Sequence, residues 1–290
     1  MERTYRTLLQ WSIEYLTQAG VEQPGTDAQA LLEEVVASSS EKAPPPLERE
    51  VDPNHGHRFR NWVERRAARE PLHYILGHRK FWSLDFKVTP DVLIPRPETE
   101  VLISHFLELK KNFPGQTSFR ILDMCTGSGV IAIVAALEVP QSQVIAVDIS
   151  NDSLAVAREN AKKHGVARKI RFLKGDLFDA THREDLGPFD FILSNPPYIR
   201  VDRIEGLMPE IKDHEPRRTF DGGSDGLNFY HAIIPDAVRL LKKGGYVIVE
   251  TGFGVHGPVC SLIRETRAFT DPVMVSDFNH YPRVVSARKK

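Results

Sequence analysis

The chain has 290 residues, 41% of them hydrophobic, which is enough for two domains or for one large domain with an appendage. Lysine and arginine number 38 against 39 aspartate and glutamate, so the net charge of -1 excludes a global positive field that would gather nucleic acid or membrane phosphate. The two cysteines lack metal-ligand spacing, and no apolar run approaches the roughly 20 residues of a membrane span, so we expect a cytoplasmic protein without a metal site.

The first part of the chain carries helical patterns. Apolar residues spaced by three and four predict an amphipathic helix over residues 5–19. A second helix is expected to begin at Thr26, because Thr26 and Gln29 fit the capping-box pattern. A third is expected to begin at Pro53, since proline suits the first helical position. Together these helices predict a small all-helical domain over residues 1–77.

The next stretch has the pattern of a β-hairpin. Residues 81–88 alternate like a strand, residues 89–91 have turn chemistry, and residues 92–94 form a second short apolar run. We therefore expect a hairpin linker over residues 78–100.

From residue 101 to residue 290, strand patterns rich in valine and isoleucine alternate with helical patterns. Strands are expected over residues 120–124, 143–149, 169–174, 189–194 and 246–250, and helices over residues 152–164 and 229–241. Such alternation is typical of βαβ units, so the fold class is α/β with a parallel sheet covered by helices on both faces. Residues 273–278 and 284–288 predict a further hairpin at the edge of the sheet.

The first strand of this sheet ends in a glycine loop, ILDMCTGSGVIAI. Asp123 stands at the strand tip, and Gly127 and Gly129 open the following helix, where free backbone N–H groups can face a ligand. The second strand ends in Asp148, whose carboxylate can accept both hydroxyls of a ribose. Ala132 stands where a dinucleotide enzyme would have a third glycine, which favours another adenosine-bearing cofactor. The alternative for Asp123 is a structural role, in which it bonds the amides of the turn.

A strand pattern at residues 189–194 ends in Asn195-Pro196-Pro197-Tyr198. Prolines end strands, so one interpretation is an ordinary turn. The other is that the Asn195 side-chain oxygen and the Pro196 carbonyl accept the two hydrogens of a conjugated nitrogen, on whose plane Tyr198 can stack. The glycine loop and Asp148 upstream favour this second interpretation.

These motifs, in this order, resemble the class I S-adenosylmethionine-dependent methyltransferases. The stretches EPLHYILGHRKFW, VLIPRPETE, DGGSDGLNFY and LKKGGYVIVE are similar to the release-factor glutamine methyltransferases of the HemK/PrmC type. The resemblance implies transfer of a methyl group from S-adenosylmethionine to the side-chain amide nitrogen (N5) of the glutamine in the Gly-Gly-Gln motif of class I peptide chain release factors. It also implies a helical domain that docks the substrate, a hairpin linker and a seven-stranded Rossmann-like domain whose last strand is antiparallel.

The resemblance also implies a set of site residues. Catalytic and substrate contacts are expected from Asn195, Pro196, Pro197 and Tyr198. Arg96, Glu98 and Glu100 either form a further wall of the substrate site, with contacts expected from Arg96 and Glu98, or brace the linker through ion pairs. Cofactor contacts are expected from Asp123, Cys125, Thr126, Gly127, Ser128, Gly129, Asp148, Ile149, Asp176, Leu177 and Asn195.

The chain departs from the family pattern in two places. Cys125 replaces the usual glycine of the cofactor loop, which we expect to alter cofactor affinity. Residues 251–256, TGFGVH, replace the more usual Ile-Gly and downstream Gln, and we expect them to lie away from the transferred methyl group.

Three other functions compete with this assignment. One is an N-methyltransferase acting on an exocyclic amino group of adenine or guanine in DNA or RNA, which the near-neutral charge disfavours. The others are a nicotinamide-dependent oxidoreductase and a helical adaptor fused to a degenerate cofactor domain. We expect a monomer that binds no nucleic acid stably.

Overall fold

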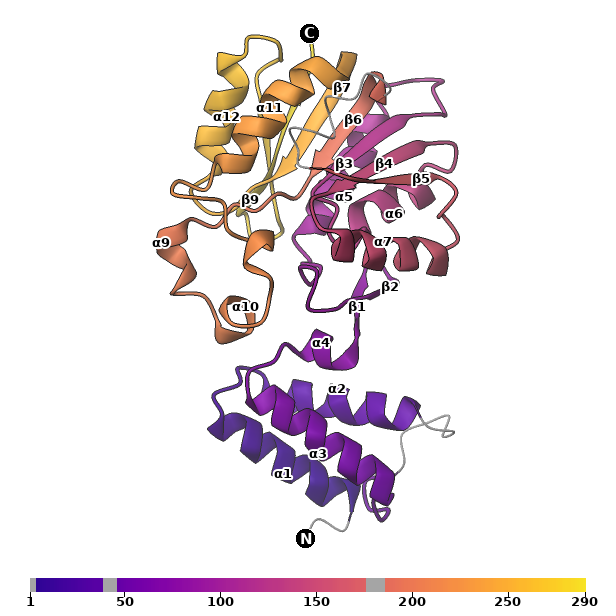
Figure 1. Cartoon of the computed structure of the whole chain (residues 1–290), viewed down its shortest axis with the longest axis vertical. Helices are drawn as coiled ribbons and strands as arrows, with labels where there is room; N and C mark the ends of the chain where they lie inside the picture. Colours follow the sequence, from indigo (N-terminus) through magenta and orange to yellow (C-terminus); the bar gives the residue numbers. More distant parts are fainter. Residues whose placement is uncertain (1–3, 39–45, 176–185) are drawn as a thin grey trace. The chain divides into compact units, whose positions relative to one another are not determined.

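The computed structural model describes residues 4–38, 46–175 and 186–290. It divides into two compact units (Figure 1). One consists of Met1–His78 with Met208–His214, and the other of Arg79–Leu207 with Glu215–Lys290. None of the described helices combines the length and the apolar composition that a bilayer span requires.

The first unit contains the helices α1 (Tyr5–Gln18), α2 (Pro24–Ala37), α3 (Pro53–Ala67) and α4 (Leu72–Leu76). The predicted all-helical character is confirmed, and their apolar faces share one core that includes Leu8, Leu16, Leu31, Val35 and Phe59. Pro53 starts α3 as expected, with the Asp52 carboxylate accepting the N–H groups of Asn54 and His55 at 2.8 and 3.2 Å.

The start of α2 differs from the expected one. The helix begins at Pro24 rather than Thr26, and its N-cap, Gln23, makes no side-chain capping bond. Proline has its φ angle fixed near the helical value, so it can open the first turn without a capping side chain. The capping-box pattern at Thr26 therefore lies inside the helix and was misleading.

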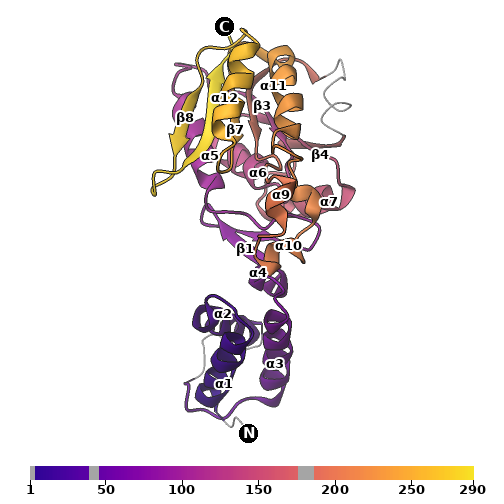
Figure 2. The same cartoon turned by 90° about the vertical axis from the view of Figure 1, so that its left-hand side faces the viewer.

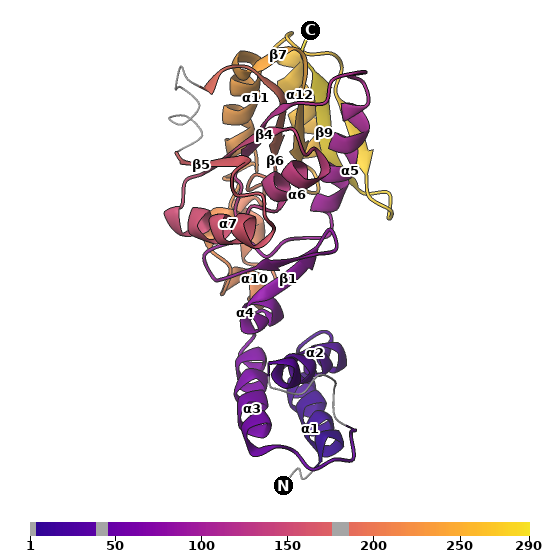
Figure 3. The ribbon, with the colours of Figure 1, turned by 90° about the vertical axis from the view of Figure 1, so that its right-hand side faces the viewer.

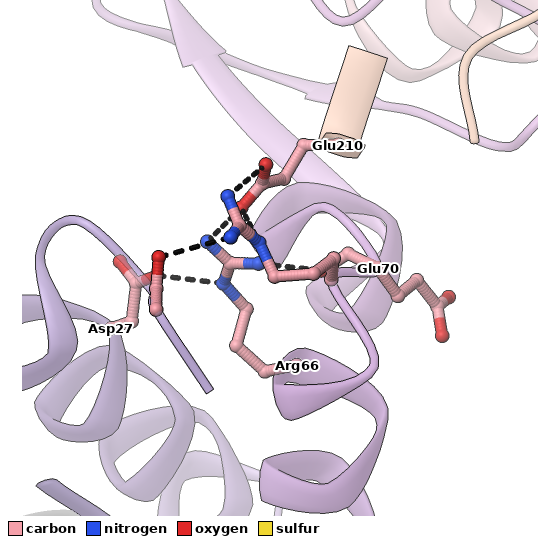
Figure 4. A network of polar contacts seen from close by, with 6 residues as sticks. Asp27, Arg66, Glu70 and Glu210 are labelled. Carbon is pink, nitrogen blue, oxygen red and sulfur yellow. Dashed lines mark hydrogen bonds and ion pairs between the residues drawn. The ribbon is translucent and has the colours of Figure 1, made fainter. Parts of the chain in front are cut away.

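A buried polar network ties a distant segment into the first unit (Figure 4). Arg66, 5% exposed, donates to Asp27 Oδ2 at 2.7 Å and to Glu210 Oε1 at 2.8 Å. Arg69 donates to both oxygens of Glu210, at 2.8 and 2.7 Å. Glu210 lies on the short helix α10 (Pro209–Lys212), which the sequence did not predict. Buried charges need partners, so this network holds residues 208–214 on α2 and α3.

The hairpin is present, but it lies earlier than expected. Its strands are β1 (His78–Phe81) and β2 (Leu84–Lys87), and residues 92–94 are not a strand. Trp82 and Ser83 form the turn with φ angles of 52° and 59°. Turns of this left-handed kind usually contain asparagine or glycine, so neither residue signals one.

The second unit is built on a seven-stranded sheet of order β5-β4-β3-β6-β7-β9-β8. Its strands are β3 (Arg120–Met124), β4 (Gln143–Asp148), β5 (Ile170–Lys174), β6 (Phe189–Ser194), β7 (Leu241–Glu250), β8 (Val273–Ser276) and β9 (Pro282–Arg288). Strands β3 to β7 are parallel, whereas β9 runs antiparallel to both β7 and β8. The predicted α/β sheet with an antiparallel last strand is confirmed.

Helices cover both faces of this sheet (Figures 2 and 3). The apolar side chains of α5 (Thr99–Lys110), α6 (Val130–Glu138) and α7 (Asn151–Lys163) contribute to one core, and those of α11 (Asn228–Leu240) and α12 (His256–Glu265) to the other. Neighbouring strand residues alternate between the two layers, as Phe191 and Ile192 do. The helices α5, α12 and the short α9 (Val201–Ile204) were not predicted.

The strand order reverses between β3 and β6. At such a switch point the connections leave toward opposite faces of the sheet, so the carboxyl ends of the strands border an open crevice. The glycine loop after β3, Asp148 at the end of β4 and the proline turn after β6 all lie at this edge.

Candidate active site

A cavity of about 810 Å³ lies at the carboxyl ends of the central strands, within the second unit. Its size is that of a site for a small molecule. Four loops that follow strands, those after β3, β4, β5 and β6, contribute to its wall, and so do the PRPETE stretch and residues 217–223. The lining includes Arg96, Thr99, Cys125, Thr126, Gly127, Ser128, Asp148, Ile149, Gly175, Asn195 and Pro197.

Asp123 holds the glycine loop from behind. Its side chain is fully buried, and its Oδ2 accepts hydrogen bonds from Thr126 Oγ1 at 2.6 Å and from the Ala132 N–H at 3.1 Å. Burial raises the pKa of this carboxyl to about 7 against the opposing effect of these two hydrogen bonds. Asp123 and Gly129 do not line the cavity. Asp123 therefore holds the loop from behind, and its direct contact with the cofactor stays a prediction.

The middle of the loop faces the cavity. Gly127 has a φ angle of 55°, and a Cβ built on it would meet no atom within 4 Å, so a ligand can approach its backbone. Cys125 also has a left-handed φ angle, 62°, which glycine adopts without strain and other residues adopt at a cost. This geometry gives a physical reason why glycine is usual at the position of Cys125.

Asp148 joins the loop to the end of β4. Its Oδ2 accepts the Gly127 N–H and its Oδ1 accepts the Ser150 N–H, both at 2.9 Å. A carboxylate has about four acceptor positions, and the backbone groups do not use all of them, so Asp148 can still accept from a hydroxyl group of a ligand. Ile149, 57% exposed, adds an apolar surface to the wall beside it. Burial raises the pKa of Asp148. Of the other expected cofactor contacts, Asp176 and Leu177 lie outside the described residues.

The proline turn presents two of its four residues to the cavity. Asn195 and Pro197 line it, whereas Pro196 and Tyr198 do not. Asn195 Nδ2 donates to Thr99 Oγ1 at 3.0 Å. No residue of the described ranges donates a hydrogen bond to the Pro196 carbonyl. The turn thus leaves the carbonyl acceptor that the two prolines were expected to leave.

Tyr198 is enclosed by glycine backbone from two later stretches. A Cβ on Gly222 would lie 2.7 Å from Tyr198 Cα, and one on Gly226 would lie 2.6 Å from the Tyr198 carbonyl oxygen. A Cβ on Gly252 would lie 2.5 Å from Cδ2 of the Tyr198 ring. This explains the first and last glycines of DGGSDG, whereas a Cβ on Gly223 would lie 2.1 Å from Asn228 Nδ2. Of residues 251–256, Gly252 packs against the Tyr198 ring and does not line the cavity, so their distance from the transferred methyl group stays a prediction.

The PRPETE stretch has different roles along its length. Arg96 lines the cavity and forms an ion pair with Glu215, which is 5% exposed. Glu98 lies 3.6 Å from Arg283 of β9, and Glu100 accepts the Trp82 N–H at 2.8 Å. Arg96 therefore lies at the wall of the cavity, whereas Glu98 and Glu100 contact other parts of the second unit.

Two polar residues at the cavity were not predicted: Thr99, which lines it, and Glu250, which does not. Thr99 donates its hydroxyl proton to Glu250 Oε2 at 2.7 Å, and the Tyr198 hydroxyl donates to Glu250 Oε1 at 3.2 Å. Both residues occur in stretches that carry the family resemblance, but neither has a charge or spacing that marks it in the sequence. Within the described ranges, no group of three His, Cys, Asp or Glu side chains is arranged to hold a metal ion.

Comparisons with known proteins agree with this architecture. A methyltransferase domain model matches residues 116–278, and a PrmC N-terminal domain model matches residues 7–77. The release factor glutamine methyltransferase of Geobacter sulfurreducens is 39% identical over 98% of this chain and 96% of its own length. That of Caulobacter vibrioides is 37% identical over 93% of this chain and 91% of its own length.

Among solved structures, the catalytic domain of hMettl16 in complex with MAT2A 3'UTR hairpin 6 is 14% identical, with a TM-score of 0.55 over 80% of this chain and 81% of that one. This similarity concerns the fold only. The match to the Geobacter protein spans both the helical part and the sheet with its glycine loop and proline turn. The protein therefore belongs to the release factor glutamine methyltransferase family.

Proposed function

We propose that this protein transfers a methyl group from S-adenosylmethionine to the side-chain amide nitrogen of the glutamine in the Gly-Gly-Gln motif of class I peptide chain release factors. The observation that carries the proposal is the proline turn, in which Asn195 lines a cofactor-sized cavity and the Pro196 carbonyl has no donor among the described residues. The nearly full-length similarity to release factor glutamine methyltransferases supports it.

The residues around the cavity fit S-adenosylmethionine. The open space above Gly127 suits the close approach of a ligand to the loop, and Asp148 can still accept from a ribose hydroxyl. Ile149 offers an apolar surface to an adenine ring. Bound there, S-adenosylmethionine supplies a methyl group already activated by positively charged sulfur.

The protein's own contribution is positioning. A carboxamide nitrogen is a weak nucleophile because its lone pair is delocalised into the carbonyl. Asn195 Oδ1 and the Pro196 carbonyl can accept its two hydrogens and hold the nitrogen in line with the methyl group. As the nitrogen–carbon bond forms, the sulfur–carbon bond breaks, and the nitrogen then loses one proton to solvent. This sequence of events requires no strong base, and none lines the cavity among the described residues.

We also propose roles for the other parts of the chain. The helical part, residues 1–77, docks the release factor, the linker over residues 78–100 contributes Arg96 to the substrate wall, and residues 101–290 carry the chemistry. Tyr198, the last residue of the proline turn, stacks on the amide plane. The enzyme acts as a cytoplasmic monomer and does not bind nucleic acid stably.

Transfer of labelled methyl groups tests the function. We expect the protein to label an intact class I release factor, and we expect no label when the glutamine of the Gly-Gly-Gln motif is changed to alanine. Asn195→Ala should lower the single-turnover rate by a factor on the order of 100 to 1000, the loss typical of one preorganised polar contact. Label found in DNA or RNA, with none in the release factor, would overturn the proposal.

A further inference from the structure

Glu250 is a buried carboxyl group directly behind the proline turn. It is 1% exposed, ends strand β7 and does not line the cavity. Its Oε2 accepts from the Thr99 hydroxyl at 2.7 Å, and its Oε1 accepts from the Tyr198 hydroxyl at 3.2 Å. The Glu250 side chain therefore contacts Thr99, which is hydrogen-bonded to Asn195, and also Tyr198, the last residue of the proline turn.

The charge of Glu250 decides the direction of these hydrogen bonds. An ionised carboxylate can only accept, so both hydroxyl protons point toward it. Thr99 then has only lone pairs to offer to Asn195. The Asn195 carboxamide must consequently turn its NH₂ group toward Thr99. The structure has this orientation, with Nδ2 3.0 Å from Thr99 Oγ1. This orientation directs Oδ1, the acceptor that the substrate amide requires, away from Thr99.

A protonated Glu250 would remove this constraint. Its own proton could point at Thr99, and the Thr99 hydroxyl could then donate to Asn195. The Asn195 carboxamide would satisfy that donor by rotating its oxygen toward Thr99. Its NH₂ group would then face the substrate NH₂ group, and two donors in contact repel each other.

We propose that Glu250 is a positioning residue that sets, through Thr99, which end of the Asn195 carboxamide faces the substrate nitrogen. The inference rests on the proposed function, because it concerns the acceptor that holds the glutamine amide. Glu250 acts through Thr99 and does not contact the substrate itself.

The surroundings of Glu250 make this orientation sensitive to pH near neutrality. Burial raises the pKa of Glu250 to about 7, although the hydrogen bonds from Thr99 and Tyr198 lower it. Nearby charges act in both directions, with Glu98 raising the pKa and Arg283 lowering it. The polar and charged groups that face Glu250 come from the PRPETE stretch and α5, the proline turn, α11 and β9: Glu98, Thr99, Tyr198, Tyr230 and Arg283.

Three variants test the inference through rates. Thr99→Val keeps the shape of the side chain and removes the hydroxyl, so the single-turnover rate should fall about 10- to 100-fold, the loss typical of a partner behind a direct contact. The affinity for S-adenosylmethionine should change little. Thr99→Ser restores the hydroxyl and should recover most of the rate. In Glu250→Gln the loss of rate that wild type shows as pH falls below about 7 should disappear.

Nuclear magnetic resonance gives a readout that does not depend on the substrate. The side-chain NH₂ signals of Asn195, identified by their loss in Asn195→Ala, should shift with pH near 7 in wild type and stay constant in Glu250→Gln. Asp123 also has a pKa of about 7, but signals that follow Asp123 would still shift in Glu250→Gln. Asn195 signals that are constant in wild type, or a Thr99→Val enzyme as fast as wild type, would overturn the inference. Absence of any release-factor labelling by wild type would instead overturn the proposed function.

Discussion

The network around Arg66 in the first unit leads to a quantitative prediction for Glu210→Gln. The substitution keeps the shape of the side chain and removes its charge. In the native protein, burial raises the pKa of Glu210, but the hydrogen bonds from Arg69 and Arg66 outweigh it and bring the pKa to about 2. The ordinary value is 4.5, and a difference of one pKa unit corresponds to about 1.4 kcal/mol.

We therefore expect Glu210→Gln to lower the free energy of unfolding of the first unit by about 3 kcal/mol at pH 7. Breaking a buried ion pair by removal of one partner typically costs a similar amount, about 3–5 kcal/mol. The native pKa lies below the unfolded one, so this stabilisation is fully present above pH 4.5 and is lost as the pH falls toward 2. The difference between the variant and wild type should shrink over the same range.

Tryptophan fluorescence can measure the unfolding of the first unit separately. The chain has 3 tryptophans, and Trp11 and Trp62 belong to the first unit, whereas Trp82 belongs to the second. In a Trp82→Phe background, urea unfolding followed by fluorescence reports on the helical unit. Glu48 forms an exposed ion pair with Arg6, so Glu48→Gln is a matched control that should cost about 0–1 kcal/mol.

Equal stabilities of Glu210→Gln and Glu48→Gln would refute the assignment of a stabilising network, and so would a difference from wild type that does not vary with pH. The affinity for S-adenosylmethionine should be the same in both variants, because every residue that lines the cavity belongs to the second unit.

Three further predictions concern the cavity and the proline turn beside it. Asp148→Ala should weaken binding of S-adenosylmethionine by a factor on the order of 100, because two hydrogen bonds to a charged acceptor are lost, and calorimetry would measure it. Iodoacetamide should modify Cys125 in the cavity wall, and S-adenosylmethionine should slow this reaction; Cys260, 4% exposed, should stay unmodified, as mass spectrometry can establish. Gly252→Ala would bring a Cβ within 2.5 Å of the tyrosine ring in the proline turn, so methyl transfer should fall at least about tenfold. Gly257→Ala, whose Cβ would meet no atom within 4 Å, should leave the rate of transfer unchanged.

Local patterns were sufficient to predict most of the sheet. Runs of valine and isoleucine bounded by turn residues predicted β3 at residues 120–124 and β6 at residues 189–194 with the bounds that the structure has. The hairpin strands were misplaced, because the Trp82-Ser83 turn adopts positive φ angles without glycine or asparagine. Only the surrounding structure compensates for such a conformation, and a single sequence does not display it.

In the candidate site, too, local patterns could be predicted from the sequence, whereas contacts between distant residues could not. Gly127, Asp148 and Asn195 could be predicted, because glycines after a strand and polar residues at strand ends lie next to each other in a parallel sheet. The pairing of Thr99 with Glu250 joins residues 151 positions apart, and both side chains are buried. A threonine at a helix start and a glutamate at a strand end each have many ordinary roles. Their connection is a property of the folded chain.

The packing around the proline turn keeps its hydrogen-bond acceptors in fixed positions, and a reaction without a strong base depends on that positioning. Two backbone hydrogen bonds, both 2.8 Å, join Ile199 to Phe220 and Gly222. The glycine backbone around Tyr198 leaves no room for a side chain, so the turn has few alternative positions. Flexible acceptors would have to be ordered in every reaction cycle, at a cost in entropy that would raise the barrier. In a rigid turn the acceptors are already in place before the substrate arrives. Glu250 adds to this by fixing, through Thr99, the rotation of the Asn195 carboxamide.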